Sequence, residues 1–183
     1  MAQSSDPTEH RRHVNGSANG ETAWSGYASE EERPPLASYA TLAGGFSCGL
    51  AAFFVLRRQR GKGLPEQLAL QDIGLVAGAS FALSRLVTKK KVTAFLRAPF
   101  TEYQGKGDAP GELEERPRGE GAKRAIGELL ICPYCLGLWV VAGFSVGLIF
   151  APRVTRFVAS LFSALTISDF FQIAYKAAEE KGL

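Results

Sequence analysis

Cys132 and Cys135 are the residues whose type and spacing could do chemistry most directly. They flank Pro133 and Tyr134 at the point where a long apolar run begins. At the start of a helix, residues i and i+3 can face one side, and the unpaired backbone amides together with the helix dipole favour a thiolate. The spacing therefore fits a dithiol that can convert to a disulfide.

Three interpretations of this cysteine pair stay open. The first is a thiol–disulfide redox pair, and the second is zinc binding, because two thiolates are half of a tetrahedral zinc site. The only histidines of the sequence, His10 and His13, lie in its polar N-terminal part, so the missing zinc ligands would come from a second copy or from Glu128 and Asp169. The third is a structural role, in which Pro133 sets the start of the helix and the cysteines are packed.

The composition argues against several function classes. The chain has 183 residues and a net charge of +3 without a basic, aromatic stripe, which disfavours nucleic-acid binding. Its three cysteines are too few for a disulfide scaffold. The sequence contains no phosphate-binding Walker loop, no His-Glu-x-x-His motif and no Gly-x-Ser-x-Gly motif. No enzyme class is therefore indicated.

Four apolar runs predict helices that cross a membrane, at residues 36–56, 68–87, 131–151 and 154–175. The first carries no charge and would be about 32 Å long as a helix, enough for about 30 Å of hydrocarbon. The mean hydropathy of −0.00 is therefore an average over polar segments and apolar runs. We predict an all-α, multi-pass bundle in a lipid bilayer, divided into 1–35, 36–63 and 64–183.

The segments between these runs are polar. Residues 1–35 hold few apolar side chains, so we predict a disordered tail. Residues 89–103 place apolar side chains at helical spacing among lysines and arginines, which predicts an amphipathic interfacial helix that Pro99 kinks or divides. Residues 105–123 are rich in glycine, proline and glutamate and are expected to form a loop without core residues.

The lysine and arginine count predicts the orientation. With both termini in the cytoplasm, 14 of these residues lie inside and six outside, although the basic cluster at 57–62 opposes this assignment. Three runs also contain Gly-x-x-x-Gly, at 45/49, 74/78 and 143/147. Because such glycines let helices approach closely, they predict helix contacts within the bundle, a homo-oligomer or a membrane-protein partner. We therefore predict a structural or accessory membrane protein that acts through helix contacts, with a membrane-bound redox or metal-binding protein as the alternative.

Span parity places several polar residues at one depth, since the second run ends, the third begins and the fourth ends on the same side. Arg85, Glu128, the cysteine pair and Asp169 share this level. Ionisable residues within spans are costly and tend to pair, so we predict an ion pair between Arg85 and Asp169. Tyr134 and Trp139 are expected to act as interfacial anchors.

Three motifs resemble the domain-of-unknown-function 1360 family, whose members are small bacterial integral-membrane proteins, some associated with sporulation. They are residues 81–86 (Phe-Ala-Leu-Ser-Arg-Leu), residues 96–100 (Leu-Arg-Ala-Pro-Phe) and residues 127–139, which read Gly-Glu-Leu-Leu-Ile-Cys-Pro-Tyr-Cys-Leu-Gly-Leu-Trp. The resemblance covers 72–175 and implies a multi-pass membrane protein without implying an activity. It singles out seven residues: Arg85, Arg97, Pro99, Glu128, Cys132, Cys135 and Trp139. Gly137 belongs to the same motif.

Overall fold

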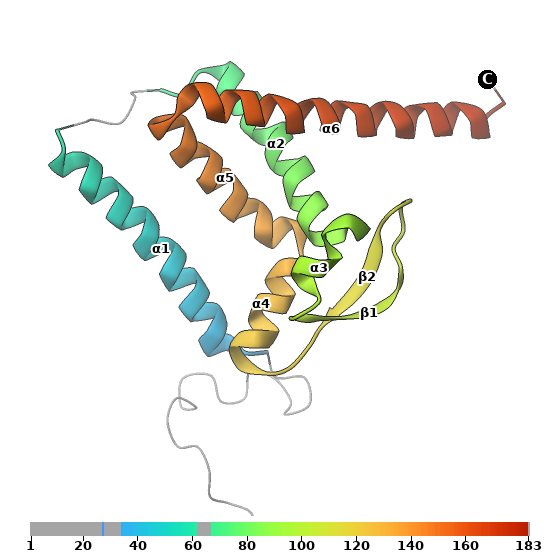
Figure 1. The fold of residues 1–183 in the computed structure, drawn as a ribbon, viewed down its shortest axis with the longest axis horizontal. Coiled ribbons are helices and arrows are strands. Elements are labelled where there is room, and N and C mark those ends of the chain that lie inside the picture. Colours follow the sequence, from blue (N-terminus) through green and yellow to red (C-terminus); the bar gives the residue numbers. More distant parts are fainter. Residues whose placement is uncertain (1–26, 28–33, 62–66, 183) are drawn as a thin grey trace, which may run out of the picture.

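The computed structural model describes Tyr27, residues 34–61 and residues 67–182 (Figure 1). The expected disordered tail lies almost wholly outside these residues. In chain order the elements are α1 (Leu36–Gln59), α2 (Leu70–Lys89), η1 (Lys91–Thr93), α3 (Ala94–Arg97), β1 (Thr101–Lys106), β2 (Leu113–Pro117), α4 (Gly121–Ile131), α5 (Pro133–Phe150) and α6 (Pro152–Glu180).

Four of these helices, α1, α2, α5 and α6, are long and apolar enough to cross a membrane. They have 24, 20, 18 and 29 residues, and each contains one of the four predicted apolar runs or most of it. Large apolar side chains remain exposed along them, including Phe54, Leu138, Phe157 and Phe171. A lipid environment explains this exposure, so the expected multi-pass α-helical membrane fold is confirmed.

Helix α2 is the centre of the bundle, because it packs against both α5 and α6. The core cluster joins Val76 and Ala79 of α2 to Phe144 of α5 and Ala159 of α6. Two of the four members are alanines, so the helix backbones approach closely there and the core is thin. Much of the packing surface of these helices therefore faces outward.

The contact between α2 and α6 relies on small and hydroxyl residues. A Cβ added to Gly78 would lie 2.9 Å from Ser163 Oγ. Ser163 Oγ donates to the Leu75 carbonyl at 2.8 Å, and Thr166 Oγ1 donates to the Gly78 carbonyl at 2.7 Å. Interhelical hydrogen bonds of this kind hold membrane helices together where lipid removes the hydrophobic driving force.

Only some glycines of the predicted Gly-x-x-x-Gly pairs contact another helix of the chain. A Cβ on Gly147 would lie 2.8 Å from Thr155 Oγ1, so this glycine and Gly78 both serve contacts with α6. At Gly45, Gly49, Gly74 and Gly143 an added Cβ would meet nothing within 4 Å. The predicted partner for these open positions stays a prediction.

Helix α1 runs beside α4 and α5 and stands apart from α2 (Figure 1). Three of its aromatic side chains, seven residues apart, lie on one face because seven residues make two helical turns. Tyr39 donates a hydrogen bond to Glu128 of α4. The ring centroid of Phe46 lies 4.8 Å from that of Trp139, and the ring centroid of Phe53 lies 5.6 Å from that of Phe150. Trp139, expected as an interfacial anchor, therefore packs against α1.

A β-hairpin takes the place of the last residues of the predicted interfacial helix. The helical part of 89–103 is reduced to η1 and the four-residue α3, after which β1 and β2 pair antiparallel. Pro99 lacks the amide that would continue α3, and the following Thr101 and Tyr103 favour extended backbone. The expected coreless loop at 105–123 contains the rest of this hairpin, the buried Glu112 and the start of α4.

Candidate redox site

The cysteine pair occupies the start of α5, as the sequence predicts. Helix α4 ends at Ile131, Cys132 is extended with φ −103° and ψ 104°, and Pro133 opens α5. Proline suits this first position because its fixed φ is helical and its missing amide would have no helical partner. The break between α4 and α5 therefore places Cys132 at the N-cap of a helix.

Cys132 and Cys135 form a disulfide, with their Cα atoms 5.3 Å apart. The Cys135 amide also donates a hydrogen bond to Cys132 Sγ at 3.2 Å. Cys135 is exposed and Tyr134 beside it is 91% exposed, while Cys132 is half-buried. The rest of the chain therefore leaves the pair uncovered on the Tyr134 side.

This geometry suits exchange between disulfide and dithiol. When the disulfide opens, the amide at Cys132 Sγ and the positive end of α5 stabilise a thiolate at Cys132. The bond closes a ring of only four residues that already belong to one helical turn. Because disulfide stabilisation grows with the length of the closed loop, this bond constrains the unfolded chain little.

The other zinc ligands considered from the sequence do not join the pair. Among residues 34–61 and 67–182, no group of three or more histidine, cysteine, aspartate or glutamate side chains is placed to hold a metal ion. Glu128 Oε1 accepts from Arg124 Nε at 3.0 Å, and its other oxygen accepts from Tyr39. Zinc binding by Cys132 and Cys135 stays a prediction that needs ligands from outside this set.

The charges near the pair are joined differently from the predicted Arg85–Asp169 ion pair. Arg85 Nη2 donates to Glu112 Oε1 at 2.6 Å, and Lys90 Nζ lies 3.6 Å from the same oxygen. Asp169 has no ion pair within the part of the chain that the structure describes. Span parity could not reveal that the hairpin returns Glu112 to the end of α2 that carries Arg85.

The course of α6 explains why Asp169 does not reach Arg85. The two-residue connection Pro152-Arg153 between the third and fourth apolar runs predicts an antiparallel helix hairpin. In the structure only Ala151 separates α5 from α6, and the two helices diverge in a V (Figure 1). Phe170, next to Asp169, stacks on Phe81 with centroids 5.9 Å apart, one turn before Arg85. Asp169 therefore lies level with the middle of α2.

An ion pair that the sequence did not reveal lies at the other end of α2. Arg156 donates from Nε and Nη2 to the two carboxylate oxygens of Asp72, at 2.7 and 2.8 Å. Such a two-pronged contact fixes the orientation of both side chains. In the sequence, Asp72 and Arg156 each lie near the start of an apolar run. Span parity places the starts of these two runs on the same side of the membrane.

Arg97, which the resemblance singled out, is the buried anchor of the hairpin. Its side chain is 0% exposed and forms a salt bridge with Glu115 of β2. Its Nη1 donates to the Val87 carbonyl at 2.6 Å, the Lys90 carbonyl at 3.2 Å and Thr93 Oγ1 at 2.9 Å. Arg97 therefore ties β2 to the end of α2, beside the region from which Arg85 reaches Glu112.

Gly127 packs α4 against this hairpin, and Pro99 contacts the segment between β2 and α4. A Cβ added to Gly127 would lie 2.6 Å from the Phe100 carbonyl oxygen and 3.1 Å from Pro117 Cβ. The Pro99 carbonyl accepts from Arg118 Nη2 at 3.2 Å, after Pro99 has ended α3. Gly137 has nothing within 4 Å of an added Cβ. The Gly-Glu-Leu-Leu segment thus packs α4 on the hairpin immediately before the cysteines.

The chain is similar to two curated proteins of known sequence. Among curated proteins, the chain is 40% identical over 74 residues to the sporulation protein YjcA and 30% identical over 89 residues to the UPF0713 protein YngL, both of Bacillus subtilis (strain 168). These matches cover 39% and 49% of this chain, and 62% and 66% of the relatives. The chain therefore spans less than two thirds of the length of the curated relatives it matches. No solved structure matches significantly.

A family model described as "Protein of unknown function (DUF1360)" matches residues 75–175. This region is more than half of the chain, and it runs from α2 through most of α6. It includes Arg97, the hairpin, Gly127 and the cysteine pair, and it excludes α1. The chain belongs to the DUF1360 family.

Proposed function

We propose that this membrane protein is a thiol–disulfide exchange protein that works through Cys132 and Cys135. The observation that carries the proposal is the disulfide at the start of α5, beside the exposed Tyr134. The hydrogen bond from the Cys135 amide to Cys132 Sγ supports Cys132 as the attacking sulfur. Cys135 is then the resolving thiol.

The exchange conserves atoms and electrons. The Cys132 thiolate of the reduced pair attacks one sulfur of a disulfide in a partner protein, and a Cys132–partner disulfide forms while the other partner sulfur leaves as a thiolate and takes up a proton. Cys135 loses its proton, attacks Cys132 Sγ and releases the second partner thiol. Two electrons and two protons pass to the partner, and the Cys132–Cys135 disulfide remains.

The side of the membrane is part of the proposal. The 14 to six distribution of lysines and arginines supports cytoplasmic termini. With that orientation, the start of α5 and the hairpin face the cytoplasm, where thiols are kept reduced. The pair would then rest as a dithiol and act on disulfides of proteins on that side.

Mixed-disulfide trapping tests the proposal in cells. In a Cys48→Ser background, which removes the exposed free cysteine of α1, Cys135→Ser should accumulate a reductant-sensitive adduct with a partner because Cys132 attacks and nothing resolves. Cys132→Ser should accumulate none. A membrane-impermeant maleimide, added to intact cells, should leave the reduced Cys132 and Cys135 of the Cys48→Ser protein unlabelled.

Each arm has an outcome that counts against the proposal. No adduct with either variant would refute exchange through this pair, and an adduct only with Cys132→Ser would assign the attack to Cys135. The matched control is the variant with both cysteines replaced, which should give no adduct. Labelling of Cys132 from outside would reverse the orientation.

A second candidate is a structural or accessory role through helix contacts, favoured by the open glycine positions of α1. Gly45 and Gly49 lie one turn apart on this helix, which has no buried residue. A neighbouring membrane helix could approach closely there. The two candidates differ at the cysteines, because an accessory role keeps Cys132 and Cys135 in one oxidation state.

A further inference from the structure

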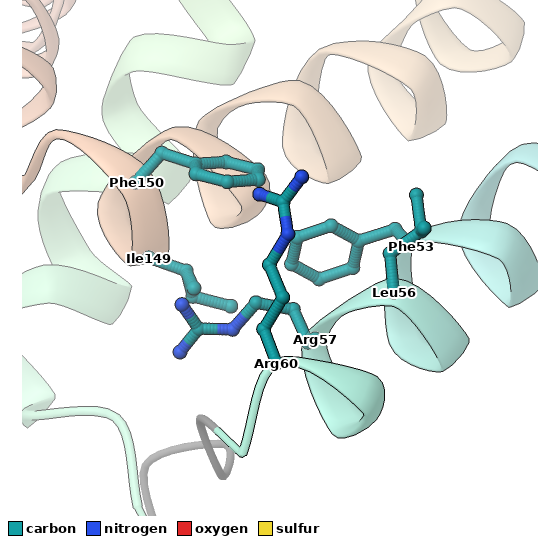
Figure 2. Close-up of a pocket in the computed structure, with 6 residues that line it drawn as sticks. All are labelled: Phe53, Leu56, Arg57, Arg60, Ile149 and Phe150. Atoms are coloured by element: carbon teal, nitrogen blue, oxygen red, sulfur yellow. The ribbon is translucent and has the colours of Figure 1, made fainter.

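A cavity of about 350 Å³ lies between the end of α1 and the end of α5 (Figure 2). It falls within the size range of ligand pockets, about 300–1,000 Å³. Six residues line it: Phe53, Leu56, Arg57, Arg60, Ile149 and Phe150. Two of them are cations and four are apolar, so the cavity combines positive charge with a hydrophobic wall.

The two lining arginines come from the last turn of α1 and the residue after it. Figure 2 shows both guanidinium groups reaching across the space towards α5, with Arg57 beside Ile149 and Arg60 between the rings of Phe53 and Phe150. The segment 57–62 holds four basic residues and no acidic one. The local charge therefore favours an anionic ligand.

The position of the cavity restricts the ligand further. It lies where two helices long enough to cross a membrane both end, at the opposite end of α5 from the cysteine pair. At such an end the lipid headgroups meet the apolar chains. A ligand that fits must present an anion to the arginines and a hydrocarbon chain to Phe53, Leu56 and Phe150.

We propose that this cavity binds an anionic phospholipid, with the phosphate held by Arg57 and Arg60 and the start of an acyl chain against the apolar wall. Guanidinium groups match phosphate oxygens through paired hydrogen bonds. Free phosphate shares the anionic chemistry but would leave the apolar wall without a partner. The inference is independent of the chemistry of the cysteines.

Native mass spectrometry of the full chain, released from micelles with equal amounts of phosphatidylglycerol and phosphatidylcholine, tests this site. The wild type should retain phosphatidylglycerol preferentially. Because one basic residue contributes about 1 kcal/mol of attraction to anionic lipid, Arg60→Gln should lower the preference about fivefold, and Arg57→Gln with Arg60→Gln about 25-fold. Arg58→Gln removes the same charge from the same helix end outside the cavity, and should change the preference less than Arg60→Gln does.

The exposed position of Arg60 makes the single variant suitable even where the double variant folds poorly. Equal effects of Arg58→Gln and Arg60→Gln would show general surface attraction and overturn the site. The absence of any phosphatidylglycerol preference in the wild type would overturn it as well. Displacement of the lipid by millimolar inorganic phosphate would identify a site for small anions and refute the phospholipid.

Discussion

Replacement of Arg97 with alanine is expected to lower the free energy of unfolding by about 3–5 kcal/mol, the cost of breaking a buried ion pair by removing one partner. The Glu115 side chain, 6% exposed, would lose its salt bridge. The carbonyls of Val87 and Lys90 would lose the donor that joins them to α3. Because these contacts hold β2 to the end of α2, the hairpin should separate from the membrane helices.

Reversible unfolding in mixed micelles measures this change, and tryptic cleavage after Lys106 in β1 reports whether the hairpin has loosened. Arg116→Ala is the matched control on the same hairpin. Arg116 pairs with Glu102 across the strands at 2.9 Å, but the two side chains are 63% and 50% exposed. Such exposed pairs contribute less than about 1 kcal/mol. Equal losses in the two variants would contradict the anchoring role of Arg97.

Gly127→Ala is expected to destabilise the protein by about 1–3 kcal/mol, the usual cost of overpacking. The added methyl group would meet the Phe100 carbonyl oxygen at 2.6 Å, and this obstacle is backbone that cannot rotate away. Helix α4 would have to move off the hairpin, and the start of α5 with it. The same micelle unfolding experiment measures the loss.

Gly137→Ala, ten residues along in the same motif, makes the matched control. Its Cβ would meet nothing within 4 Å, and alanine is up to about 1 kcal/mol better than glycine inside a helix. This variant should therefore be as stable as the wild type or slightly more stable. A loss at residue 137 that equals the loss at residue 127 would mean that the contact with Phe100 does not decide the effect.

The membrane helices could be predicted from the sequence because their signal is local. A run without charges and long enough to cross the hydrocarbon leaves few alternatives, and the basic residues at 57–62 and 89–91 mark where two runs end. The cysteine spacing was equally local, since two thiols at i and i+3 beside a proline predict a helix start. Both features appear where the sequence placed them.

The hairpin could not be predicted in the same way. Residues 101–117 have no alternating apolar pattern, and charged side chains of this segment are buried instead. Glu112 pairs with Arg85, and Glu115 pairs with Arg97. A polar, glycine-rich segment indicates a loop unless its charges find partners elsewhere in the fold. Those partners lie in α2 and α3, so their identity depends on the tertiary structure.

The same limit explains the ion pairs. Span parity assigns a charged residue to one side of the membrane, but several residues share each side. Parity predicted a pair between Arg85 and Asp169, but α6 diverges from α5 and Arg85 pairs with Glu112 instead. Asp72 and Arg156 meet because each lies near the start of its helix and α2 packs directly on α6.

The most direct test of the thiol–disulfide function is a redox titration of Cys132 and Cys135 in the Cys48→Ser protein, equilibrated with glutathione buffers and read out by alkylation. The proposed function predicts one two-electron transition with a midpoint between about −120 and −270 mV, the range of exchange-active pairs. A midpoint below about −300 mV, typical of structural disulfides, would contradict it, as would alkylation that does not change with potential.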